Sequence, residues 1–285
     1  NYSVGDMGVK FDRDRQDTET FLVVLKNGWR RADKKKEMLF RTYNDGTLRA
    51  VLSERYAIID NGWYLGVLEA LFKKMGGEAP RLSHWRTDGA DTIYGNLLIP
   101  DTCREDTDSD YGGMLSIGNC EIGKRRLSQV PSVFRAICMN GCIWDQNEGE
   151  KLNKVHRGQI DYKALISAIF DNLNSQIPLL ADGVKRFLAT KEMLIPKVQL
   201  QQAFAQLAIE NKFTAKMTGM VVNEYINHEA NSHNLFGIIN AVTRAGQLLD
   251  NEGWYAMDLL GGTLMNYTRP QFEKFMGKAN NLTKE

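Results

Sequence analysis

Basic side chains interleaved with aromatic rings are the residues whose types and spacing point most directly to chemistry. They cluster near the start of the chain, between residues 29 and 56, and return in a basic run at residues 124–126. Lysine and arginine neutralise phosphates and aromatic rings stack on unpaired bases, so this combination is typical of sequence-tolerant binding to single-stranded nucleic acid. The predicted binding residues are Trp29, Arg30, Arg31, Lys34, Lys35, Lys36, Arg41, Arg49, Arg55, Lys124, Arg125, Arg126 and Arg135.

A second polar set surrounds two glycine-containing turns between residues 112 and 144. It consists of Asn119, Glu121 and Asn140, together with His156 in the polar loop that follows. One interpretation is that the two turns converge with Arg135 on a groove. The other is that the Asn-Gly pair is a plain turn and that Glu121 neutralises a neighbouring arginine.

An enzyme that uses Glu121 and His156 is an alternative function. A carboxylate or an imidazole beside a reacting group acts as a general base. The chain has no nucleophile elbow, no phosphate-binding loop and no paired-carboxylate motif, so the sequence names no catalytic residue.

The sequence predicts no metal site and no cofactor. Its four cysteines, Cys103, Cys120, Cys138 and Cys142, are too few for a disulfide framework in 285 residues and lack the further ligands that zinc requires. The acidic segment 101–110 begins like a calcium loop but lacks the required glycine and the final glutamate. We therefore expect free thiols and a solvated acidic loop.

Composition predicts a globular protein of the reducing cytoplasm with no membrane association. No apolar run approaches the ~20 residues that cross a bilayer. The formal net charge is only +1, so binding to nucleic acid has to rest on local clusters of charge.

The basic and polar residues lie in a part of the chain that alternates between strand and helix signals. We predict a polar arm over residues 1–20, an antiparallel β-rich α+β part with a basic groove over residues 21–150, and a helical part over residues 160–285. A hairpin around Asn44-Asp45-Gly46 would bring Arg41 and Arg49 near each other. A helix over 63–75 ends at Gly76, and a strand pair follows over 81–100.

Helical periodicity dominates after residue 160. The predicted helices span residues 162–174, 184–193, 196–209, 214–228, 234–249 and 254–265, with a short last helix from Pro270. The helix over 234–249 has an apolar face, and a small-residue run follows at Gly261-Gly262-Thr263. This face serves either the core of the domain or the assembly of several copies.

The order of several short motifs resembles a known family. These are Leu48 to Tyr56, an Asn-x-Glu-x-Gly turn ending at Gly123, an Arg-x-x-Cys-x-Asn-Gly segment from Arg135, the loop at His156, and a late segment from Asn234 to Thr243. Together they resemble the phage- and plasmid-associated family known as domain of unknown function 932, over about residues 40–265. This chain has Cys120 where such relatives often carry serine, which argues against a hydroxyl-dependent role there.

The resemblance implies a mobile-element protein of a phage or plasmid, acting in the cytoplasm of a bacterial host, and it implies no established activity. Proteins of this setting commonly handle single-stranded DNA in recombination or replication, and the order of an α+β part and helices looks broadly like that of phage single-strand annealing proteins. We therefore expect a homo-oligomeric single-stranded DNA binding or annealing factor. A structural or regulatory assembly protein with no nucleic-acid role remains the other alternative to the enzyme.

Overall fold

The computed structural model describes residues 38–43, 47–76, 79–88, 91–105, 110–135, 140–143 and 152–282. The chain divides into two compact units. One comprises Asn1–Ala57 with Arg157–Gln159, and the other comprises Ile58–His156 with Ile160–Glu285. The predicted arm over residues 1–20 lies outside the described residues.

The first unit contains a β-hairpin, as predicted. Strand β1 (Met38–Thr42) pairs antiparallel with β2 (Leu48–Ser53). The register shifts between Arg41, which faces Ala50, and Thr42, which faces Leu48, so the hairpin has an irregularity at Arg49. The Asn-Asp-Gly turn itself lies outside the described residues.

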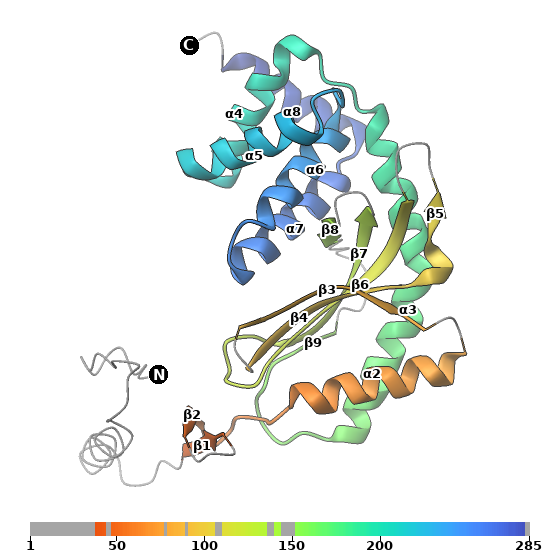
Figure 1. The fold of residues 1–285 in the computed structure, drawn as a ribbon, viewed down its shortest axis with the longest axis vertical. Coiled ribbons are helices and arrows are strands. Elements are labelled where there is room, and N and C mark those ends of the chain that lie inside the picture. The colour runs from red at the N-terminus through yellow and green to blue at the C-terminus, as the bar shows by residue number, and fades with distance from the viewer. Residues whose placement is uncertain are drawn as a thin grey trace, which may run out of the picture. The chain divides into compact units, whose positions relative to one another are not determined.

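The second unit is built on a seven-stranded antiparallel sheet (Figure 1). The strand order is β3 (Arg81–Asp88), β4 (Thr92–Leu98), β6 (Asp110–Cys120), β7 (Leu127–Arg135) and β8 (Asn140–Ile143). Two short strands join this path: β5 (Arg104–Glu105) pairs with β6, and β9 (Leu152–Lys154) pairs with β7. The predicted strand pair over 81–100 is confirmed by β3 and β4.

Helices α2 (Asn61–Met75) and α3 (Tyr162–Ala189) cover one face of the sheet with a shared apolar core. The predicted helix over 63–75 is confirmed, and Gly76 ends it in the left-handed conformation with φ of 75°. A close approach positions α3. A Cβ at Gly113 would lie 2.3 Å from the Cβ of Leu180, so only glycine lets this strand and helix meet there.

The prediction of two helices on either side of Pro178 is wrong, because α3 is one helix of 28 residues. Proline removes one helical hydrogen bond and costs about 3 kcal/mol in a helix interior. Pro178 lies on the exposed side, while Leu173, Leu180 and Val184 are fully buried on both sides of it. Burial of this continuous apolar stripe offsets the lost bond and keeps both halves of the helix on the sheet.

Five further helices form the C-terminal half of the second unit: α4 (Leu200–Asn211), α5 (Ala215–His228), α6 (Leu235–Gly246), α7 (Asn251–Met265) and α8 (Arg269–Asn281). They match the predicted helices, except that the segment after Pro196 begins with a short 3-10 turn, Lys197–Gln199, before α4. The fold class is α+β, as predicted. Among the described helices, none combines the length and the apolar composition that crossing a bilayer requires.

The change from strands to helices near residue 155 is not a boundary between compact units. Helix α3 packs on β6 and β7, and α7 lies against β3 and β8, so sheet and helices share one unit. The apolar face predicted on the helix over 234–249 belongs to the interior, because all of α6 except Arg244 is buried. Gly261 of α7 packs closely against Thr243 of α6.

Candidate functional site

A hollow lies at the end of the sheet where β7, β9 and the turn between β6 and β7 meet α7. Its volume is about 280 Å³. Ser128 of β7 and Asn153 of β9 are register partners, and both line the hollow. The full lining is Arg125, Arg126, Ser128, Val130, Leu152, Asn153, Tyr255 and Leu259. The hollow thus combines two arginines, an aromatic ring, two polar groups and three aliphatic side chains.

Arg125 is fixed against two tyrosine rings at the edge of this hollow. Its guanidinium carbon lies 4.1 Å from the ring centroid of Tyr94 and 4.5 Å from that of Tyr255. Burial lowers the pKa of Arg125, and the nearby Tyr255 and Glu252 oppose that change. Burial also raises the pKa of the Tyr255 hydroxyl. Nε of Arg125 is buried, and no described residue accepts a hydrogen bond from it. A cation partly withdrawn from water attracts an anion more strongly than a fully solvated one, because the surrounding dielectric is lower.

A second cation–aromatic contact fixes the start of α7 on the sheet. Arg86 of β3 donates from Nη2 to the carbonyl of Gln247 at 2.8 Å and from Nη1 to the carbonyl of Leu249 at 3.1 Å. Its guanidinium carbon lies 4.7 Å from the centroid of a ring of Trp254. Because Tyr255 is the next residue, these contacts determine where the Tyr255 ring meets the hollow.

A small cavity with both apolar and polar lining residues lies beside the hollow, between the sheet and α7. Ser128 and Tyr255 line both spaces. The hydroxyl of Ser116 lies 2.7 Å from Oδ1 of Asn96, within hydrogen-bond distance. Asp258 of α7 also lines the cavity and is 1% exposed. Burial raises the pKa of Asp258 well above its usual range, and the charge of Arg86 opposes this change.

Apart from Arg135, the predicted binding residues fall into three groups. Lys124, Arg125 and Arg126 occupy the β6–β7 turn, and the two arginines line the hollow. Arg41, Arg49 and Arg55 belong to the first unit, where the Arg49 guanidinium carbon lies 5.4 Å from the ring centroid of Tyr43. Trp29, Arg30, Arg31, Lys34, Lys35 and Lys36 lie outside the described residues.

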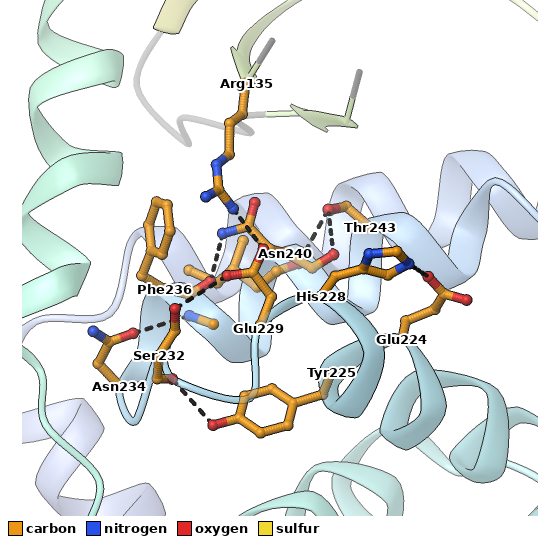
Figure 2. Close-up of polar contacts among 12 residues, drawn as sticks. Arg135, Glu224, Tyr225, His228, Glu229, Ser232, Asn234, Phe236, Asn240 and Thr243 are labelled. Carbon is orange, nitrogen blue, oxygen red and sulfur yellow. Dashed lines mark hydrogen bonds and ion pairs between the residues drawn. The ribbon is translucent and has the colours of Figure 1, made fainter. Parts of the chain in front are cut away.

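Arg135 is not a surface residue, which corrects its place in the predicted binding set. Its Nη1 lies 2.5 Å from Oε1 of Glu229, and the two side chains are 8% and 3% exposed. Figure 2 shows the arginine reaching from the sheet to the glutamate on the turn after α5, next to Phe236. Ser232 donates from its hydroxyl to the other carboxylate oxygen at 3.2 Å. The pair joins β7 to the turn after α5 and is buried.

The predicted groove of Asn119, Glu121, Asn140 and Arg135 is not formed. Asn119 and Glu121 lie at the C-terminal end of β6, whereas Arg135 pairs with Tyr111 near the other end of that strand. The Glu121 carboxylate accepts from the backbone N–H of Asn61 at 2.7 Å, and the Asn119 amide donates to Oδ1 of Asn61 at 2.8 Å. A carboxylate at a helix N-terminus satisfies an orphan donor and favours the helix dipole. These two residues therefore attach α2 to the sheet.

The remaining members of the polar set lie elsewhere. Asn140 pairs through its backbone with Arg135 at the start of β8. His156 is 6% exposed and thus buried in the second unit, not displayed on a polar loop. Of the described cysteines, Cys103 is exposed, whereas Cys120 and Cys142 are buried. Within the described ranges, no cluster of three histidine, cysteine or acidic side chains has a metal-binding arrangement.

The sequence patterns do not single out Tyr94, Asn153, Tyr255 or Asp258. Tyr94 falls in a strand whose apolar pattern predicts only a core position, and Asn153 falls in a polar segment that predicts a loop. The aromatic pair at the start of α7 was a usable signal, since Trp254 and Tyr255 follow a polar turn. Nothing in the sequence indicates that they meet Arg125.

Comparison of this chain with protein-family models, with curated proteins and with solved structures found no match. The resemblance to the family of domain of unknown function 932 therefore stays a prediction.

Proposed function

We propose that this protein binds single-stranded nucleic acid, with DNA favoured, in the hollow between the sheet and α7. The observation that supports this most directly is the contact of Arg125 with Tyr94 and Tyr255 at the edge of a concave, basic surface. Grooves that bind single strands combine cations that follow the phosphates with rings that stack on bases.

The lining assigns a role to each side of the hollow. Arg126 and the neighbouring Lys124 are exposed and contact phosphates, whose counterions are released on binding. Arg125 and Tyr255 are half-buried and offer a rigid stacking surface for a base, worth about 1–3 kcal/mol per base. Val130, Leu152 and Leu259 form an apolar floor. An apolar floor accepts the face of any base, so we expect weak sequence preference.

The test is a fluorescence anisotropy titration of a labelled oligothymidylate of about 30 nucleotides, repeated from about 50 mM to about 200 mM salt. Arg125→Ala/Arg126→Ala is expected to weaken binding at least about tenfold and to reduce the salt slope by about one phosphate contact, that of Arg126. The matched control is Lys216→Ala/Lys274→Ala, which removes two exposed cations of α5 and α8 that do not line the hollow. Absence of binding at low salt, or equal weakening by both double variants, refutes the proposal.

Annealing and oligomerisation extend the same proposal. We expect the protein to accelerate the pairing of complementary oligonucleotides that are added one after the other, as a factor in the recombination or replication of a mobile element. Light scattering with and without the oligonucleotide measures whether the assembly depends on nucleic acid. Binding without any acceleration of pairing limits the function to strand binding or protection.

The alternative of an assembly protein without a nucleic-acid role is favoured by one surface. Leu194 and Val198 are 71% and 81% exposed, next to a hollow of about 250 Å³ that Met193, Phe272 and Met276 line together with polar groups. Exposed apolar side chains beside a hollow are a feature of protein contact sites. Assembly that is abolished by Val198→Asp and unaffected by oligonucleotides favours this alternative.

A further inference from the structure

Asp258 is the most anomalous polar residue that the structure describes. It is 1% exposed, and no described residue forms a hydrogen bond with either carboxylate oxygen. Buried polar groups are bonded in the great majority of cases, and each exception calls for a physical explanation. Burial favours the neutral acid because an unpaired buried carboxylate loses its hydration without compensation.

The position of Asp258 connects it to the hollow. The carboxyl lines the small cavity whose other walls include Ser128 and Tyr255, and these two residues are also part of the wall of the hollow. Tyr255 is three residues before Asp258 on α7, so both side chains project from the same side of the helix. The carboxyl therefore lies directly behind the surface on which we place the nucleic-acid strand.

No described residue forms an ion pair with the Asp258 carboxyl. Titratable residues lie on each of the elements that pack against α7. Arg86 comes from β3 and acts on it through space. Arg244 is the charged residue of α6, and β8 contributes the thiol of Cys142. The remaining titratable groups on the packed elements are Tyr94 of β4, Arg125 of the β6–β7 turn, and Tyr255 and Glu252 of α7.

We propose that Asp258 sets the affinity of the hollow for nucleic acid through its protonation, the neutral acid permitting strand binding and the carboxylate opposing it. This inference rests on the proposed function. A negative charge behind the wall repels phosphates, and the low-dielectric interior screens it poorly. Bound phosphates in turn disfavour the carboxylate. Strand binding therefore takes up a proton from solution onto the carboxyl oxygen between the pH at which free Asp258 ionises and the higher pH at which it ionises in the complex, and dissociation releases that proton.

The test is the dissociation constant for the labelled oligothymidylate from about pH 6 to about pH 9 at fixed ionic strength. For the wild type, we expect the dissociation constant to rise with pH by at most about tenfold per pH unit and then to level off. Asp258→Asn keeps the shape and removes the proton, so it should bind as tightly as the acid form and lose this trend. Glu252→Gln removes an exposed carboxylate of the same helix and should retain the trend.

The outcomes separate this inference from the function on which it rests. Absence of binding by the wild type at every pH refutes the proposed function. If the wild type binds but Asp258→Asn shows the same pH trend, or if neither protein shows a trend, only the proposed role of Asp258 is overturned and the proposed function stands. Calorimetry of the wild type in two buffers of different ionisation enthalpy, made at a pH where the wild-type dissociation constant rises, provides a measurement independent of any variant. Binding there without proton uptake also overturns the role of Asp258.

Discussion

The buried pair of Arg135 and Glu229 allows a quantitative test of how the sheet is joined to the helices. Replacement of either partner alone leaves a charge in a site where both side chains are less than a tenth exposed, at 8% and 3%. Breaking a buried pair in this way costs about 3–5 kcal/mol, whereas replacing both charges by apolar groups is often close to neutral. We therefore expect Arg135→Met and Glu229→Met each to destabilise strongly, and the double variant to be more stable than either.

The surroundings of the pair predict which single variant is worse. Lys191 holds its ammonium 5.0 Å from the centroid of the Phe236 ring, on which the Arg135 guanidinium also packs at 4.8 Å. Glu229→Met leaves the Arg135 guanidinium buried without this carboxylate, so we expect a cost of about 5 kcal/mol. Arg135→Met leaves Glu229 with the hydrogen bond from the Ser232 hydroxyl, so we expect about 3 kcal/mol.

The assay is urea unfolding followed by tryptophan fluorescence, combined into a double-mutant cycle. We expect the double variant to cost at least about 3 kcal/mol less than the sum of the single variants. The control is the exposed α3 pair of Lys185 and Asp182, joined at 2.8 Å, whose removal should cost no more than about 0.5 kcal/mol. Additive effects within error, or single variants as mild as the control, would refute the argument that burial makes this pair essential.

Two further predictions concern single residues of the sheet and α7. Burial raises the folded-state pKa of Asp258 above its usual value. The folded state therefore keeps a proton that the unfolded chain loses above about pH 4. As a result, the contribution of Asp258 to the free energy of unfolding falls as pH rises from about 4 through the folded-state pKa, by up to about 1.4 kcal/mol per pH unit. Asp258→Asn should thus match the wild type near pH 4 and exceed its urea midpoint near pH 7, and a pH-independent difference contradicts this. Gly113→Ala would place a Cβ 2.3 Å from the Cβ of Leu180, so we expect the free energy of unfolding to fall by about 3 kcal/mol or more, measured as a lower melting temperature. The control is Gly66→Ala, which should not destabilise the protein because the new Cβ meets nothing within 4 Å. A small effect at Gly113 would show that α3 moves away from β6 at little cost.

Local signals in the sequence determined much of the secondary structure. The apolar runs around Asn-Asp-Gly predicted β1 and β2, and Gly76 predicted the end of α2, because each depends on neighbouring residues and backbone conformation. The helix beginning after Thr214 was likewise predictable, since its side chain accepts from the N–H of Met217 only three residues later. The same local reasoning divides α3 into two helices at Pro178, which is wrong, because the burial that keeps α3 intact comes from its contacts with the sheet.

The candidate site was predictable only in part. The basic run at residues 124–126 carries its signal in sequence, and its two arginines line the hollow. The rings that fix Arg125 come from β4 and α7, and Glu229, which removes Arg135 from the surface, is 94 residues away from it. Charge and composition establish that a residue is able to bind an anion. Whether it faces a hollow or a buried carboxylate depends on which distant elements pack beside it, and that was decided only by the tertiary structure.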